Sequence, residues 1–189
     1  MKFQANVPFK LTKLFYEKLG EQPKDKRILV IRDFFTAMHA AIDNSVTFIT
    51  DDKEAYDLFN KNVASNDEFG NDDTTLYVDT EINKNAWKDF IKEIAGMPKF
   101  DIAIMMNQPR DGNLHLKILE AVIPIADKVV NISPIRWLQD PLAKYKKNSD
   151  YKKFEESISK KIESLEVLDV ELSNNLFDIA NFGALGIYK

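Results

Sequence analysis

Apolar residues in this chain form compact runs, and these runs alternate with stretches of helical spacing. The compact runs predict seven strands, at residues 27–32, 46–50, 74–79, 100–106, 128–133, 165–172 and 184–188. Helical spacing predicts helices at residues 9–20, 34–42, 53–63, 85–95, 114–126 and 149–163. The helix at 85–95 places Trp87, Phe90, Ile91 and Ile94 on one face, which is typical of a core-facing helix.

Regular alternation of strand and helix is typical of an α/β fold. We predict a Rossmann-like, mostly parallel seven-stranded sheet with helices on both faces. Residues 1–26 then form an N-terminal helical extension, and residues 27–189 form the α/β domain. Ligands of such sheets bind beyond the carboxyl ends of the strands. The polar residues that directly follow the strands are therefore the candidate site residues.

Composition narrows the class of protein. The chain has 189 residues and no cysteine, which excludes disulfides, thiolate metal sites and a cysteine nucleophile. His39 and His115 lie far apart in the sequence without ligand spacing, so we expect no metal. The first residues lack the apolar segment of a signal peptide, and no apolar run approaches the roughly 20 residues that span a bilayer. We expect a cytoplasmic protein without membrane partners.

Charge is unevenly distributed along the chain, although the net charge is only −4. Residues 33–81 contain twelve Asp and Glu and two Lys, a balance of −10. Residues 128–161 contain nine Lys and Arg and four Asp and Glu, a balance of +5. Two solvated faces of opposite charge would explain this uneven distribution. The same distribution would also suit one acidic and one basic binding surface.

The strand at 100–106 runs directly into Asn107-Gln108-Pro109-Arg110. This turn resembles the Asn-Pro-Pro-Tyr motif of adenine-N6 DNA methyltransferases from restriction–modification systems, which belong to the class I S-adenosylmethionine-dependent methyltransferases. The likeness covers residues 27–188. In that family, the first residue and a backbone carbonyl of the turn bind the adenine amino group, and the aromatic ring stacks on the flipped-out base.

The turn departs from the family motif at two of its four positions. Asn107 and Pro109 match the motif. Gln108 replaces a proline and frees a backbone that the family keeps stiff. Arg110 replaces the aromatic ring and brings positive charge towards the amine that would have to attack the methyl donor. The resemblance therefore implies a catalytic site that is degenerate.

The expected cofactor site also departs from the family. The family's first strand ends in a glycine-rich turn, whereas Arg32-Asp33-Phe34-Phe35-Thr36-Ala37 follows here, and Phe34 and Phe35 could fill the space. Asp51 and Asp52 are candidates for the ribose-binding acid after the second strand. Asp79 is the candidate on the adenine side, and Asp33 follows the first strand. We expect no cofactor, or S-adenosylmethionine if the site is retained.

Basic and aromatic residues cluster towards the C-terminal part of the chain. The cluster comprises Arg136, Trp137, Lys144, Tyr145, Lys146, Lys147, Tyr151, Lys152 and Lys153. It could hold phosphates and stack a base, or form a solvated surface. We expect no counterpart of the target-recognition domain that many such methyltransferases carry.

Three functional hypotheses remain open on the sequence. The first is a catalytically degenerate methyltransferase-like protein of a phage or mobile element. It would bind and inhibit or modulate a DNA-handling enzyme of nuclease, restriction or CRISPR type. Its acidic residues 33–81 would then imitate the DNA backbone. The second is an active adenine-N6 DNA methyltransferase that needs a separate specificity subunit. The third is a DNA-binding module without catalysis.

Overall fold

The computed structural model describes residues 9–65, 72–83, 85–106, 113–133, 150–177 and 184–189. These residues form a seven-stranded sheet with the strand order β3-β2-β1-β4-β5-β7-β6. The strands are β1 (Arg27–Ile31), β2 (Ser45–Thr50), β3 (Thr74–Tyr77), β4 (Phe100–Met106), β5 (Ala126–Ser133), β6 (Ile162–Val167) and β7 (Ala184–Tyr188). Strand β7 runs antiparallel to β5 and β6, and the remaining neighbours are parallel. The predicted fold class is confirmed.

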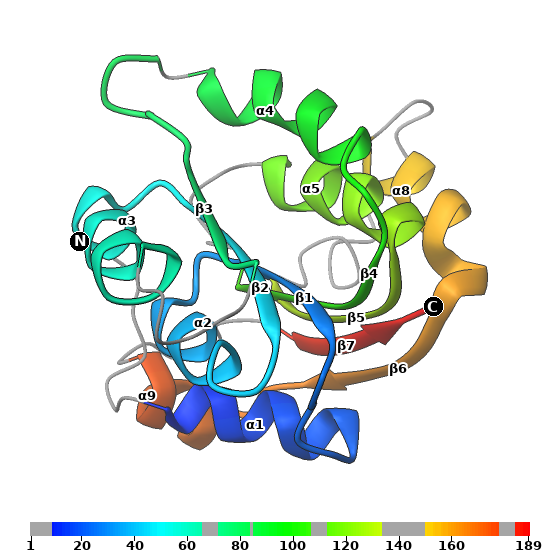
Figure 1. The fold of residues 1–189 in the computed structure, drawn as a ribbon. Helices are drawn as coiled ribbons and strands as arrows, with labels where there is room; N and C mark the ends of the chain where they lie inside the picture. The colour runs from blue at the N-terminus through cyan, green and yellow to red at the C-terminus, as the bar shows by residue number, and fades with distance from the viewer. Residues whose placement is uncertain (1–8, 66–71, 84, 107–112, 134–149, 178–183) are drawn as a thin grey trace.

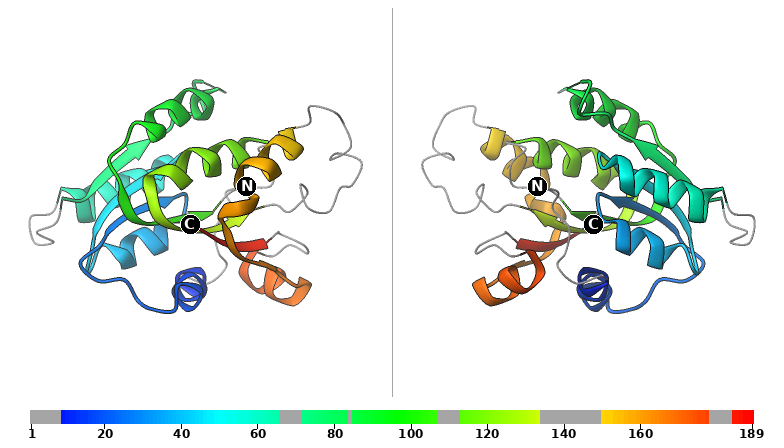
Figure 2. Two further views of the ribbon diagram at one scale, coloured as in Figure 1. Left: turned by 90° about the vertical axis from the view of Figure 1, so that its right-hand side faces the viewer. Right: turned by 90° about the vertical axis from the view of Figure 1, so that its left-hand side faces the viewer.

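Helices cover both faces of the sheet, which gives three layers (Figures 1 and 2). One face carries α1 (Lys10–Leu19), α2 (Phe34–Ala40), α3 (Lys53–Phe59) and α9 (Val170–Phe177). The other carries α4 (Ala86–Ala95), α5 (Leu114–Val122) and α8 (Asp150–Ile158). Short turns η1 (Asn60–Ala64), η2 (Ile123–Ile125) and η3 (Ser159–Lys161) follow α3, α5 and α8.

The core consists of one apolar cluster on each face of the sheet. Strand β1 shows why, because its side chains alternate: Ile28 and Val30 enter one cluster, and Leu29 and Ile31 enter the other. Trp87 and Ile94 of α4 are buried in the second cluster, and Phe90 and Ile91 pack against it.

The predicted N-terminal extension contains α1, which packs into the first cluster through Leu11, Phe15 and Leu19. Helix α1 also touches α2 through polar groups, since the Thr12 and Thr36 hydroxyls lie 2.8 Å apart and hydrogen bond. Gly20 ends the helix with φ 82°, a left-handed conformation that favours glycine. Helix α1 is therefore a part of the packed core.

The predicted strand at 165–172 is wrong in its second half. Strand β6 ends at Val167, and α9 begins at Val170. The Asp169 carboxylate accepts a hydrogen bond of 2.7 Å from the Leu172 amide, and its carbonyl accepts one from the Ser173 amide. Asp169 thus caps a helix. Alternating apolar and acidic residues gave this segment the appearance of a strand.

Among the described residues, no helix is long and apolar enough to cross a membrane. The same residues bring together no group of three or more His, Cys, Asp or Glu side chains in a position to hold a metal ion.

Candidate functional site

The carboxyl ends of β1, β2, β3 and β4 share one edge of the sheet. The order of the strands reverses between β1 and β4, which is the position where such sheets bind ligands. The structure brings the four predicted cofactor residues to this edge. Asp33 follows β1, Asp51 and Asp52 follow β2, and Asp79 follows β3.

Asp51 is bound by Arg32, the residue that follows β1. The Arg32 guanidinium contacts both carboxylate oxygens, with Nε to Oδ1 at 3.2 Å and Nη2 to Oδ2 at 2.9 Å. The Arg32 side chain is only 2% exposed, and the Asp51 side chain is 19% exposed. This bidentate pair is therefore largely shielded from water, where charge-assisted hydrogen bonds are strong.

Trp87 of α4 completes the same arrangement from the opposite side. The Arg32 guanidinium lies 4.5 Å from the centroid of the Trp87 ring, within the range of a cation–π contact. The indole Nε1 also donates a hydrogen bond of 2.9 Å to Asp51 Oδ2. Trp87 was predicted to lie in the core and does so. Its contact with Asp51 was not predicted.

Arg32 adopts a left-handed backbone conformation, with φ 67°. Residues other than glycine rarely adopt this conformation, and the cost is about 1 kcal/mol or more. Phe34 and Phe35 were the predicted fillers of the space after β1. Phe34 packs instead against Phe48 in the first core cluster, and the Phe34 and Phe35 rings contact each other. Arg32 is the side chain that reaches Asp51.

Asp33 directly precedes α2 and is buried, with 4% of its surface exposed. The Thr36 hydroxyl donates a hydrogen bond to its carboxylate, and Thr36 also hydrogen bonds with Thr12 of α1. Burial raises the pKa of the Asp33 carboxyl from its ordinary value of 3.8 to about 6, and hydrogen bonds from Thr36 and Phe35 oppose this rise. Thr36 therefore connects Asp33 to α1 through Thr12.

Asp52 and Asp79 each order the local backbone. The Asp52 carboxylate accepts hydrogen bonds from the Glu54 and Ala55 amides, at 3.0 and 3.3 Å, and so caps α3. The Asp79 carboxylate accepts hydrogen bonds from the Glu81 and Ile82 amides, at 3.1 and 2.9 Å. Such bonds between a side chain and nearby amides close a turn.

Other predicted site residues lie outside the described residues. These are Asn107, Gln108, Pro109, Arg110, Arg136, Trp137, Lys144, Tyr145, Lys146 and Lys147. Strand β4 ends at Met106, directly before the predicted catalytic turn. Lys152 and Lys153 are described, and both are exposed on α8. Lys152 Nζ lies 3.7 Å from Glu156 Oε1, one helical turn away.

Several solved structures share this architecture. TrmN from Thermus thermophilus aligns with a TM-score of 0.56 and 10% identity over 95% of this chain and 48% of its own. Precorrin 8W decarboxylase from Methanobacterium thermoautotrophicum aligns with a TM-score of 0.54 and 12% identity, covering 95% and 87%. Magnesium protoporphyrin IX methyltransferase (ChlM) from Synechocystis PCC 6803, with bound SAH, aligns with a TM-score of 0.52 and 10% identity, covering 94% and 79%.

The chain has the class I methyltransferase fold. At these identities the likeness shows the fold alone. No family model matches the sequence, and the search of curated proteins finds no significant match. In this methyltransferase fold, the edge that carries Arg32, Asp51 and Trp87 is the edge at which a ligand is expected.

The four predicted acids at this edge differ in what they can still bind. Asp33 is enclosed, while Asp52 and Asp79 hold backbone amides. Asp51 accepts from both Arg32 and Trp87. A ligand hydroxyl could use Asp51 only if it displaced one of these donors or took a remaining lone pair.

Proposed function

We propose that this protein acts by binding a partner and does not transfer methyl groups. The observation that carries the proposal is the pairing of Arg32 with Asp51 at the ligand-binding edge of a methyltransferase fold. If Asp51 is the ribose-binding acid that the resemblance predicts, an arginine of the same chain holds the oxygens that the ribose hydroxyls would need.

The described residues do not fit S-adenosylmethionine in that orientation. Its sulfonium is positively charged, and the resemblance predicts that it lies near the turn that follows β1. The guanidinium of Arg32 occupies this turn and already balances the carboxylate of Asp51, so that carboxylate is not available to balance the sulfonium. The Cβ atom and side chain of Arg32 also stand where the family has a glycine.

The partner that we propose is a protein that handles DNA, such as a nuclease or a restriction or CRISPR enzyme. Support comes from the acids of residues 33–81. Asp33 and Asp73 are buried, so these two carboxyls contribute little to the exposed surface. Glu54, Asp57 and Glu81 are exposed and belong to the same stretch. Such a surface would suit a basic DNA-binding groove.

Calorimetry tests whether the protein binds S-adenosylmethionine, which methyl transfer would require. We expect no saturable heat from the natural protein at about 1 mM cofactor. Arg32→Gly is the informative variant, because glycine suits the left-handed backbone and removes both Arg32 hydrogen bonds to Asp51, while the bond from Trp87 remains. Micromolar affinity of the natural protein would contradict the proposal. Micromolar affinity together with methyl transfer to DNA would favour an adenine-N6 DNA methyltransferase with a separate specificity subunit.

Competition tests the nature of the partner. A nuclease or methylase that binds this protein should be released when double-stranded DNA is added. The double variant Glu54→Lys, Glu81→Lys should bind that enzyme more weakly than the natural protein does. Lys152→Glu together with Lys153→Glu is the comparison variant, since it changes charge in the basic cluster on α8, across the sheet from Glu54 of α3. A protein that instead binds DNA itself, with affinity that falls steeply with salt, would be a DNA-binding module.

A further inference from the structure

A separate cavity lies at the opposite edge of the sheet, away from Arg32 and Asp51. Arg27, Ser45, Thr74 and Phe100 line it, and each is the first residue of its strand. The cavity therefore opens at the amino ends of β1 to β4. Its volume is about 440 Å³, within the range of small-molecule sites, roughly 300–1,000 Å³.

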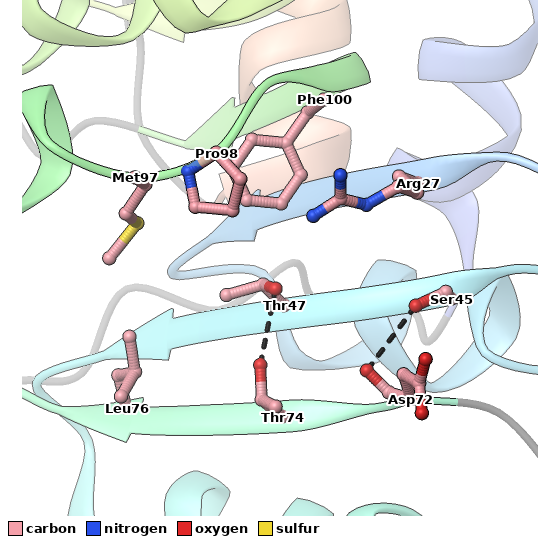
Figure 3. A pocket seen from close by; sticks show the side chains of 9 residues that line it. All are labelled: Arg27, Ser45, Thr47, Asp72, Thr74, Leu76, Met97, Pro98 and Phe100. Carbon is pink, nitrogen blue, oxygen red and sulfur yellow. Dashed lines mark hydrogen bonds between the residues drawn. The ribbon is translucent and has the colours of Figure 1, made fainter.

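Hydroxyl groups form the floor of this cavity (Figure 3). Thr74 Oγ1 donates a hydrogen bond of 3.1 Å to Thr47 Oγ1, and Ser45 Oγ donates one of 3.3 Å to the Asp72 carbonyl. The Thr47 oxygen is an acceptor in its bond, and no described residue accepts its proton. Thr47 can therefore donate a hydrogen bond into the cavity.

Arg27 supplies a cation between the hydroxyl groups of the floor and the facing wall, which Met97 and Phe100 form. Its backbone amide donates to Asp101 Oδ2 at 2.7 Å, which fixes the start of β1. Its guanidinium carbon lies 5.6 Å from the centroid of the Phe100 ring, and Figure 3 shows it directed into the space between Phe100 and the strands below. Among the described residues, no carboxylate forms an ion pair with this guanidinium.

The two ends of the cavity differ in chemistry. Arg27, Ser45 and Asp72 lie at one end, and Leu76 and Met97 lie at the other (Figure 3). Leu76 and Met97 are half-buried. Phe100 and the thioether of Met97 are suited to contact with a flat apolar ring.

We propose that this cavity binds a small monocarboxylate with a flat apolar body. The carboxylate would accept hydrogen bonds from Arg27 and Thr47, which are the charged and neutral donors in the cavity. The ring would lie between Leu76 and the wall formed by Met97 and Phe100. The carboxylate of Asp72 lies at the charged end and selects against a phosphate dianion, because each added negative charge increases repulsion.

Titration with indole-3-acetate tests this proposal, with binding measured by calorimetry and by ligand-observed NMR. Tryptophol, the neutral alcohol, and tryptamine, the cation, share its indole ring and serve as matched ligands. We expect saturable binding of indole-3-acetate and roughly tenfold weaker binding of tryptophol, the loss expected for one charged hydrogen bond. Tryptamine should bind no better than tryptophol.

Substitutions in and beside the cavity test whether the ligand binds there. Arg27→Gln should weaken indole-3-acetate about tenfold and leave tryptophol unchanged. Lys26→Gln, on the exposed neighbouring residue, should change neither. Asp72→Asn should tighten indole-3-acetate. Four results would overturn the proposal: no saturable binding of indole-3-acetate, tighter binding of tryptamine than of tryptophol, equal effects of the Arg27 and Lys26 variants, or weaker binding of indole-3-acetate after Asp72→Asn.

Discussion

Arg32 and Asp51 form a bidentate ion pair across the carboxyl ends of β1 and β2, with contacts of 3.2 and 2.9 Å. Parallel pairing aligns Ile31 with Ile49, so the residues that follow these two strands are close neighbours. Trp87 covers the pair from α4. Charges in this position are protected from water and salt, and each of them depends on its partner.

Removing the charge of Asp51 should destabilise the protein. Asp51→Asn keeps the size of the side chain but removes the carboxylate charge that pairs with the buried Arg32 guanidinium, which should cost about 3 kcal/mol of unfolding free energy. Urea denaturation measures this change. Asp57→Asn is the control, because it breaks the exposed Lys53–Asp57 pair and should have a much smaller effect. Equal losses in the two variants would show that the shielding of Asp51 has no energetic consequence.

Asp33 should make stability depend on pH. Its pKa is about 6 in the folded protein and 3.8 ordinarily, so the folded state holds the proton more tightly than the unfolded state. The stability from this proton is complete below pH 3.8 and is lost as the pH rises towards 6. Asp33→Asn should therefore stabilise the protein at neutral pH by roughly 2 kcal/mol, and less as the pH falls.

Denaturant midpoints measured across that pH range would check the Asp33 prediction. Asp43→Asn changes an exposed acid near the end of α2 and serves as the control. A destabilising Asp33→Asn at neutral pH would mean that the charged carboxylate is the form that the Thr36 hydroxyl and its neighbours require.

Gly186→Ala should destabilise the end of the sheet. A Cβ atom at this position would lie 2.7 Å from the Cε2 and hydroxyl oxygen atoms of Tyr188, a residue that is only 1% exposed and has little room to shift. Overpacking of this kind costs about 1–3 kcal/mol. Gly96→Ala is the comparison, since its Cβ would lie 3.5 Å from the nearest atom. Thermal unfolding of both variants is the measurement, and similar midpoints would argue against the clash.

Asp52→Ala should cost about 1 kcal/mol, because Asp52 caps α3. Asp52→Ser retains an acceptor for the Glu54 and Ala55 amides and should recover most of this loss. Chemical denaturation compares the three proteins. If the Ala variant kept full stability but altered the binding of a nucleoside ligand, Asp52 would be a ligand contact and not a structural cap.

Sequence patterns predicted most of the sheet, because strands buried on both faces have to be apolar at successive positions, as in Ile28-Leu29-Val30-Ile31. Helix α9 was missed entirely, since the cap at Asp169 depends on one local hydrogen bond within an alternating sequence. The position of four acids at one edge followed from the predicted topology.

The pairing of those acids could not be predicted. Arg32 and Asp51 are 19 residues apart, and Trp87 lies 36 residues beyond Asp51. Their contact depends on how three separate segments pack. One signal was present in the sequence: Arg32 is a charged residue directly after an apolar strand, at the position where the resembled family has a glycine-rich turn.

Strand β7 follows β6 in the chain but lies between β5 and β6 in the sheet. During translation, the side of β5 that pairs with β7 therefore stays unpaired until the ribosome has released residues 184–188. These residues are made long after β5 itself. An open edge on a nascent chain invites pairing with other molecules. Expression at lower temperature or with chaperones that shield such edges should raise the yield of this protein more than changes to its surface.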